Sequence, residues 1–504
     1  MTNSITTYSR ENGGRVLLLF LLFLLAIYLF ITAGFNSFAI VCFIPLLLFG
    51  AITVFKWRMS AFWLLILINH FIQWKEFPSS SIPTSLYNEM LQMLLLGIAI
   101  IDARQTPHFE RAANLMLFGL TIWCGFCTIE VLNDTCGLGI NLNAWYTGAR
   151  MLAFQLFYTF LVFTIYISSP DILRKYLILW ASLSLFSAFW TLKQQYIGLT
   201  TNEAIFLASS PTHIIQGGTL IRYFSTFSDA STYGCNAAAS AVAFIVFGIT
   251  TKFKKERWFF LIVAAFVIKS MFASGTRTAI FCMFAGMAVY IVLSKSFKIA
   301  IPAALVGFAI FSFLAFTNIA QGNQQIRRMR SAFRKGDAST KTRDINQETM
   351  KKYMKDAPWG IGLGMYGQQV PANNKYNRMA TIAADSEYVF IWLRTGVIGI
   401  SIFILTTLIM LVGACIIVFF RLKSPSLRGI GGGLCSAFVA IHLGGYGNQV
   451  LLQFPNALTF YGGLSIVYIL PFIEAEWIKY EENYIAKQEE KKRLKIEKEL
   501  ASRV

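Results

Sequence analysis

The chain has 504 residues, of which 56% are hydrophobic and 14% are charged. This composition excludes an ordinary soluble protein, because the hydrophobic residues fall in blocks whose lengths fit a hydrocarbon core of roughly 30 Å. The formal net charge of +19 is compatible with nucleic-acid binding. Most of the basic residues flank the apolar blocks, however, where they act as topology signals. We therefore expect a membrane protein that binds no nucleic acid.

Hydropathy marks fourteen apolar segments, each of which we expect to form a helix. The predicted fold is an all-α polytopic membrane protein with about 12 to 14 transmembrane helices, because several segments are shorter than a full span. The first segment is not followed by a small-residue cleavage site, so we expect it to stay as a helix. The segments cover residues 16–33, 38–55, 61–72, 86–101, 112–131, 151–167, 177–192, 237–249, 258–272, 279–293, 299–316, 396–420, 430–443 and 458–473.

The charge of the connections predicts which side of the membrane each one faces. If residues 1–15 are cytoplasmic, every cytoplasmic connection carries a basic cluster, whereas the outer connections 133–143 and 448–455 have no Lys or Arg. This is the pattern of the positive-inside rule. It predicts a multi-pass protein of the inner (cytoplasmic) membrane with both termini in the cytoplasm. Residues 16–473 then form the transmembrane domain, and residues 474–504 form a charged cytoplasmic C-terminal helix.

Two predicted outer connections are long, at about 197–236 and 317–395. Before Asp385, the second holds twelve Lys and Arg residues against four Asp and Glu, which gives a net charge of +8. So much positive charge in a periplasmic loop indicates an anionic partner at the outer surface. Helical spacing places Arg327, Arg330 and Arg334 on one face of an amphipathic helix, which would contact either lipid headgroups or a substrate.

Five residues in the outer connections are candidates for chemistry. Arg222, Arg277 and Arg343 either reach toward the lipid interface or converge on a pyrophosphate, which guanidinium groups bind in bidentate fashion. Asp385 and Glu387 stand where the next apolar segment begins. One of them could act as a general base on a hydroxyl group, or both could serve the helix that follows as its cap and its first turn.

A glycine-rich stretch, Gly360–Gly367, has four glycines in eight residues, which would let the backbone approach a ligand closely. It lacks the Lys-Ser/Thr ending of a phosphate-binding P-loop. The predicted outer face also has no DxD or HExxH motif. We therefore expect chemistry that uses neither a metal nor a cofactor.

Four landmarks, taken together with the predicted topology, resemble the O-antigen ligase and polymerase superfamily of bacterial membrane glycosyltransferases. The resemblance covers residues 222–399. The landmarks are the Arg222–Gly234 loop, the Ser-Gly-Thr-Arg277-Thr-Ala helix start, the segment from Arg343 through Ala-Pro-Trp-Gly-Ile-Gly-Leu-Gly, and the Asp385-Ser-Glu-Tyr through Arg394-Thr-Gly-Val-Ile-Gly segment.

The resemblance implies a GT-C-like fold and a glycan donor linked to undecaprenyl pyrophosphate. An acceptor hydroxyl, on a glycan or a lipid, would attack the anomeric carbon while Arg222, Arg277 and Arg343 stabilise the leaving pyrophosphate. Family ligases typically carry His-Asn where this chain has Asp385-Ser386. This departure favours a polymerase of O-antigen, capsule or exopolysaccharide repeat units, with Asp385 as the first candidate base and Glu387 as the second.

Three alternatives stay open at the level of sequence. A ligase would transfer finished glycan to lipid A-core or to protein. A glycolipid flippase or other transporter commonly shows internal repeats and ionisable residues in mid-membrane, and this chain has no obvious repeat and few such residues. The third alternative is a structural component of an assembly. The expected partners are the lipid-linked glycan, its acceptor, membrane lipids and, for a polymerase, a chain-length regulator.

Overall fold

The computed structural model describes residues 21, 24, 28, 56–77, 84–101, 109–210, 213–215, 220–319, 322–331, 333 and 338–501. The chain divides into two compact units, residues 1–64 and 65–504. The described part of the first unit is mainly the beginning of helix α3. The predicted cytoplasmic tail 1–15 lies outside the described residues, as do the predicted helices 16–33 and 38–55 except for three isolated positions. All contacts described below belong to the second unit.

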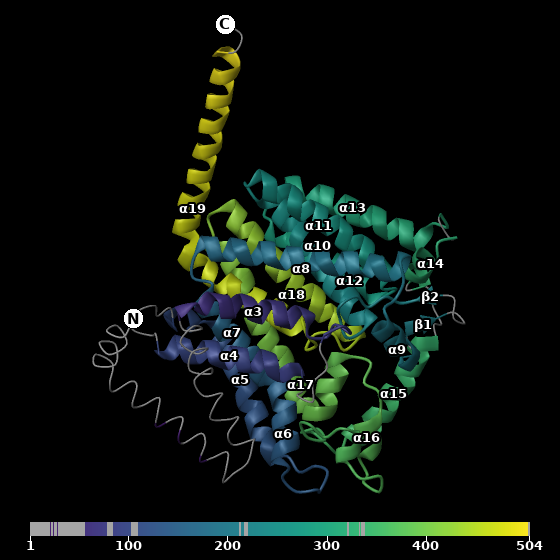
Figure 1. Ribbon diagram of the computed structural model, residues 1–504. Helices are drawn as coiled ribbons and strands as arrows, with labels where there is room; N and C mark the ends of the chain where they lie inside the picture. Colours follow the sequence, from purple (N-terminus) through teal and green to yellow (C-terminus); the bar gives the residue numbers. More distant parts are fainter. Residues whose placement is uncertain are drawn as a thin grey trace. The chain divides into compact units, whose positions relative to one another are not determined.

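The described residues are mostly helical, with one two-stranded antiparallel sheet (Figure 1). The α-helices are α3 Arg58–Phe71, α4 Thr84–Ile101, α5 Leu115–Ile129, α6 Leu142–Ala149, α7 Gln155–Tyr166, α8 Pro170–Tyr196, α9 Thr201–Ser209, α10 Ala230–Thr250, α11 Lys254–Ala273, α12 Thr278–Leu293, α13 Phe297–Phe316, α14 Gln324–Ser331, α15 Ala338–Met354, α16 Asn377–Thr381, α17 Glu387–Ile416, α18 Pro425–Gly447 and α19 Asn456–Ala501. Short 3₁₀ or π turns are η1 Phe109–Ala112, η2 Glu130–Leu132, η3 Arg150–Phe154, η5 Gly367–Gln369 and η6 Ile417–Arg421, and the strands are β1 Ile214–Ile215 and β2 Leu220–Ile221.

Each predicted apolar segment from 61–72 onward coincides with a helix of the structure. Among the described residues, seven helical runs are long and apolar enough to cross a membrane, and the shorter helices Ser85–Ile101 and Thr278–Leu293 are also apolar. An all-α membrane protein is therefore confirmed, whereas the count of 12 to 14 spans and the GT-C architecture stay predictions. The last predicted span and the charged tail form one continuous helix, α19.

Helices α10 and α18 form the centre of the second unit. Their membrane-length windows are 89% and 83% buried, and α10 packs against α11, α12 and α18. Small residues make this packing possible, because they let helix backbones approach closely in a membrane. At Gly433 of α18, for example, a Cβ atom would lie only 2.8 Å from the ring of Phe247 on α10.

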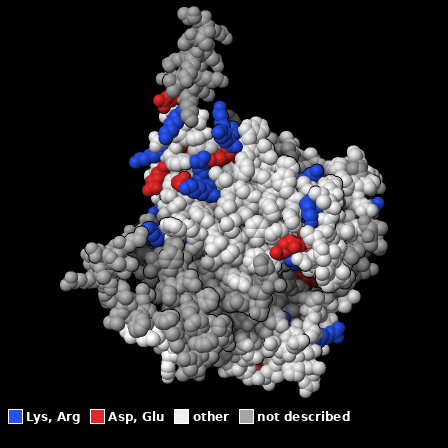
Figure 2. Space-filling view, viewed as in Figure 1, with Lys and Arg blue, Asp and Glu red and all other residues white. Residues whose placement is uncertain are grey.

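Three of the connections predicted to be cytoplasmic meet at α19, through Arg174, Lys252 and Lys423. Arg174 pairs with Glu256, and Lys252 Nζ lies 2.8 Å from the carboxylate of Glu481. Glu474 accepts hydrogen bonds of 2.7 Å from the backbone N–H groups of two residues that precede α18. Figure 2 shows the resulting cluster of basic and acidic side chains where α19 leaves the other helices.

The connections predicted to face outward also contact one another. Asn133, which follows α5, donates to the carbonyl of Trp359 at 2.9 Å. Asn448, which follows α18, donates to the hydroxyl of Thr278 at 3.0 Å. These contacts join the predicted outer loop 317–395 to the connection after α5, and the connection after α18 to the start of α12.

Candidate functional site

Arg222 is held in a fixed place by backbone and hydroxyl groups. It follows β2, and its backbone N–H donates to the carbonyl of His213 at 2.9 Å. Its guanidinium donates to the hydroxyls of Ser231 at 2.8 Å and Thr276 at 3.2 Å. Burial lowers the pKa of Arg222 below its usual range, and the carboxylate of Asp229 acts in the opposite direction.

The turn Ser274–Thr276 joins α11 to α12 and brings a second arginine close to Arg222. Gly275 has a φ of +60°, a left-handed conformation that favours glycine. Arg328 Nε on α14 donates to the Gly275 carbonyl at 2.7 Å. A Cβ at Gly275 would lie 3.3 Å from Arg328 Cδ and 3.4 Å from Arg222 Cγ. Both arginine side chains therefore pass next to this turn.

Arg277 completes what we call the arginine cluster, Arg222, Arg277 and Arg328. It occupies the N-cap position of α12 and is near enough to Arg222 to interact with it electrostatically. The nearby carboxylate of Asp229 caps α10 by accepting hydrogen bonds from Ser231 N at 2.7 Å and Thr232 N at 3.0 Å. Guanidinium groups gathered in this way are suited to binding a phosphate or pyrophosphate.

The sequence identifies Arg222 and Arg277 as candidates, but it does not identify Arg328. Helical spacing groups Arg327, Arg330 and Arg334 on one face, and this group does not include Arg328. Only the packing of α14 beside the Ser274–Thr276 turn shows where Arg328 lies. No signal in the sequence distinguishes it from the neighbouring arginines.

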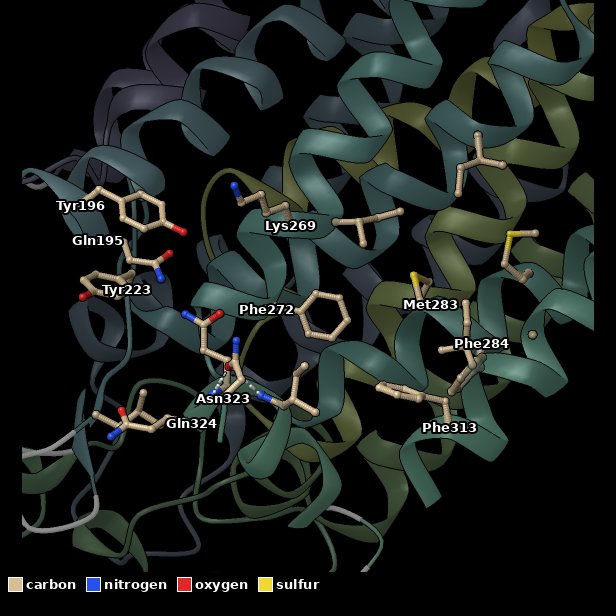
Figure 3. A pocket seen from close by; sticks show the side chains of 18 of the residues that line it. Gln195, Tyr196, Tyr223, Lys269, Phe272, Met283, Phe284, Phe313, Asn323 and Gln324 are labelled. Carbon is tan, nitrogen blue, oxygen red and sulfur yellow. Dashed lines mark hydrogen bonds between the residues drawn. The ribbon is translucent and has the colours of Figure 1, made fainter. Parts of the chain in front are cut away.

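A large cavity adjoins the arginine cluster. It has a volume of about 1320 Å³ and is bordered by α8 and α10–α14. Figure 3 shows polar side chains on one side of it and apolar ones on the other. Its polar lining includes Gln195, Tyr196, Tyr223, Lys269, Asn323 and Gln324, and its apolar lining includes Met283, Phe284 and Phe313. We call it the apolar cavity, because its lining is mostly hydrophobic.

A second, smaller cavity of about 440 Å³ contains Asp385 and is called the Asp385 cavity. Its walls come from the start of α12, from α15, from the residues that lead into α17, and from the end of α18. The lining includes Thr278, Asn346, Gln347, Ser386 and Tyr446. Polar side chains of these kinds hydrogen-bond readily to the hydroxyl groups of a carbohydrate.

Two predicted arginines belong to elements that form the walls of the Asp385 cavity. Arg277 directly precedes the lining residue Thr278. Arg343 is on α15, three and four residues before Asn346 and Gln347, so the three positions share one face of the helix. The side chain of Arg343 lies outside the described residues.

Glu387 has a different environment from Asp385. Its side chain is buried, with 2% exposed. Its Oε2 atom accepts hydrogen bonds from the backbone N–H groups of Leu451 at 3.0 Å and Leu452 at 3.4 Å. The carboxylate therefore stabilises the connection between α18 and α19. Ser386 is at the N-cap position of α17, but its hydroxyl donates to the carbonyl of Gly445 at 3.1 Å instead of capping the helix.

The glycine-rich stretch packs against the protein's own backbone. Gly362 N donates to the carbonyl of Arg394 at 3.1 Å, and Ile361 N donates to that of Leu393 at 3.0 Å. Gly364 has a φ of +75°, and a Cβ there would lie 1.7 Å from the carbonyl oxygen of Ala144. These glycines thus permit close packing against the protein's own backbone. This packing accounts for the glycine-rich stretch without a bound ligand.

Arg394 fastens this stretch to α17. The residue is 4% exposed. Its guanidinium donates to the carbonyl of Met365 and lies 4.4 Å from the ring centre of Tyr366. Helix α17 kinks nearby at Gly396, where φ is +66°. The stretch follows α15 in sequence, so these contacts connect the α15 and α17 walls of the Asp385 cavity.

Residues 262–404 match the family model described as O-antigen ligase. This segment, a little over a quarter of the chain, is similar to the O-antigen ligase family. The match confirms the resemblance to the O-antigen ligase and polymerase superfamily, whose members are membrane proteins. The domain includes Arg277, Arg328, Arg343 and Asp385, whereas Arg222 precedes it. No curated protein matches the chain.

Proposed function

We propose that this protein is a polymerase that joins glycan repeat units carried on undecaprenyl pyrophosphate, at the outer face of the bacterial inner membrane. The observation that carries the proposal is that the arginine cluster adjoins both cavities. Tyr223 of the apolar cavity follows Arg222, and Thr278 of the Asp385 cavity follows Arg277. The apolar cavity suits a polyprenyl tail, the arginine cluster suits a pyrophosphate, and the Asp385 cavity suits an acceptor sugar.

In the proposed reaction, the Asp385 carboxylate takes the proton of an acceptor hydroxyl. The hydroxyl oxygen forms a bond to the anomeric carbon of the donor glycan. The bond between that carbon and the pyrophosphate oxygen breaks, and its electron pair leaves with undecaprenyl pyrophosphate. The arginines stabilise the negative charge that grows on this leaving group. Because they supply the positive charge, the reaction needs no metal ion.

The choice of a polymerase rests on Asp385-Ser386, which stand where family ligases typically carry His-Asn. A ligase is the second candidate, because the matched family model is described as O-antigen ligase. The same residues would serve it, with lipid A-core or a protein as the acceptor. The products distinguish the two, because a polymerase changes the length of the glycan and a ligase changes its attachment.

The test is to delete the gene in its host, separate the surface glycans by gel, and rescue with the wild type, Arg343→Ala, Asp385→Asn or Glu387→Gln. Immunoblots of membrane fractions would verify equal amounts of each variant. For a polymerase, we expect single repeat units on their normal anchor, rescue by the wild type and Glu387→Gln, and no rescue by Arg343→Ala or Asp385→Asn. Normal-length glycan accumulating on undecaprenyl pyrophosphate would indicate a ligase. Unchanged glycans would contradict both functions.

A further inference from the structure

We propose that Arg328 of α14 binds the pyrophosphate of the lipid-linked donor beside the apolar cavity. The inference rests on the proposed function, which supplies a polyprenyl pyrophosphate as the donor. The sequence left two roles open for the basic helix at 324–331, contact with lipid headgroups and contact with a substrate. The inference selects contact with a substrate and assigns it to Arg328 among the three arginines of this helix.

The three arginines of α14 have different surroundings. Arg327 is exposed. Arg330 is 5% exposed and points toward α13, where its Nη2 donates to the hydroxyl of Thr317 at 3.1 Å and its guanidinium lies 5.0 Å from the ring centre of Phe313. Arg328 alone is bonded to the Ser274–Thr276 turn. Arg330 therefore anchors the helix, and Arg328 extends toward the arginine cluster.

The position of Arg328 also fits the shape of a polyprenyl pyrophosphate. The residues just before it, Asn323–Ile326, line the apolar cavity. Arg222 stands between two further lining residues, Ile221 and Tyr223. Both arginines are thus at the boundary between a charged site and an apolar space, where the phosphate end and the tail of such a lipid meet. Figure 3 shows Asn323 and Gln324 on the polar side of this cavity.

Side chains of like charge lie beside the Ser274–Thr276 turn. Arg222 and Arg328 lie next to the same glycine, and Arg222 is bonded to hydroxyl and carbonyl oxygens. Arg277 acts on Arg222 as a like charge, and a pyrophosphate bound beside the turn would attract every arginine of the cluster. Charge-assisted bidentate bonds to phosphate oxygens are among the stronger hydrogen bonds in proteins.

The experiment measures binding of farnesyl pyrophosphate, a short polyprenyl pyrophosphate, to the full-length protein in lipid nanodiscs. The variants are Arg328→Ala, Arg328→Lys, Arg222→Ala and, as the matched control, Arg327→Ala, each first examined by thermal melting. We expect Arg328→Ala and Arg222→Ala to weaken binding by about tenfold or more. Arg328→Lys should lose less, because it keeps the charge and loses only the bidentate geometry. Arg327→Ala should bind like the wild type, and farnesol should bind all folded variants equally.

The outcomes separate this inference from the proposed function. If Arg222→Ala weakens binding and Arg328→Ala behaves like Arg327→Ala, Arg328 is not part of the site and the donor assignment stands. If neither substitution changes binding of farnesyl pyrophosphate, both proposals fail. If Arg328→Ala and Arg328→Lys weaken farnesol binding as much as farnesyl pyrophosphate binding, the residue shapes the apolar cavity and the inference is wrong.

Discussion

Arg222 and Arg328 donate hydrogen bonds to the same short turn, although they are about a hundred residues apart in sequence. Arg222 Nη2 is 3.2 Å from the Thr276 hydroxyl, and Arg328 Nε is 2.7 Å from the Gly275 carbonyl. The turn therefore sets the spacing of two cations beside the apolar cavity. A change in its backbone should disturb both at once.

The first prediction concerns Gly275→Ala. The new methyl group would lie 3.3 Å from Arg328 and 3.4 Å from Arg222 at a φ of +60°, so we expect glycan synthesis to fall by about tenfold or more. Gly137→Ala is the control, because Gly137 has a similar φ of +65° with nothing within 4 Å of the added atom. Both variants should lose about 1–2 kcal/mol of stability through backbone strain.

Gel analysis of glycans and thermal melting of the purified proteins would measure these two effects. Equal loss of glycan synthesis in Gly275→Ala and Gly137→Ala would show that strain alone is responsible. That result would contradict a role of the turn in spacing the arginines.

The second prediction separates Glu387 from Asp385. Glu387→Gln keeps an oxygen that can accept the N–H groups of Leu451 and Leu452, so activity should persist with a modest loss of stability. Glu387→Ala leaves these buried donors without their acceptor, which costs about 1–3 kcal/mol for each unsatisfied group. Its melting temperature should fall clearly. Complete loss of activity in Glu387→Gln, with normal melting, would instead identify Glu387 as the base.

The third prediction concerns pH. Burial, aided by the positive charge of Arg222, lowers the pKa of His213 from its usual 6.5. Asp229 and the hydrogen bond with Ser210 oppose this shift, and Lys75 adds to it. The unfolded chain therefore binds more protons than the folded one below about pH 6.5, so stability falls as the pH falls through this window.

His213→Gln tests the sign of this effect. Nε2 of His213 lies 3.3 Å from Ala230 N, and the glutamine oxygen can accept the same bond without titrating. Between pH 7.5 and 5.5, the melting temperature of the wild type should therefore fall more than that of the variant. Parallel curves for the two proteins would mean that His213 titrates alike in the folded and unfolded states.

The fourth prediction concerns Arg394→Met. The substitution removes the donor to the Met365 carbonyl and the cation beside Tyr366, at an expected cost of about 1–3 kcal/mol for the unsatisfied carbonyl. The stretch Gly360–Gly367 should then separate more readily from α17. Limited proteolysis or hydrogen exchange at this stretch would measure the opening. Arg378→Met, which removes a charge from the same loop, serves as the control, and equal protection in both variants would contradict the role of Arg394.

Much of the fold follows from local sequence. A run of apolar residues must form a helix in a membrane, because the helix satisfies its own backbone hydrogen bonds. The segments from 61–72 onward could therefore be located without a structure. The ends of the helices are predicted less accurately. Helix α10 begins at Ala230, seven residues before the predicted start at residue 237. Asp229 caps a first turn that is polar, and hydropathy does not detect such a turn.

The sequence by itself determined the membrane class, the helical segments, the concentration of basic residues between positions 327 and 378, and the similarity of residues 262–404 to the O-antigen ligase family. These depend on local composition and on motif order. Only the tertiary structure decided that Arg328 lies beside Arg222, that Asp385 lines a cavity, and that Glu387 bonds the α18–α19 connection. Each of these depends on contacts between residues far apart in the chain. Neighbouring residues such as Arg327 and Arg328, or Asp385 and Glu387, look equivalent until helix packing directs them to different surroundings.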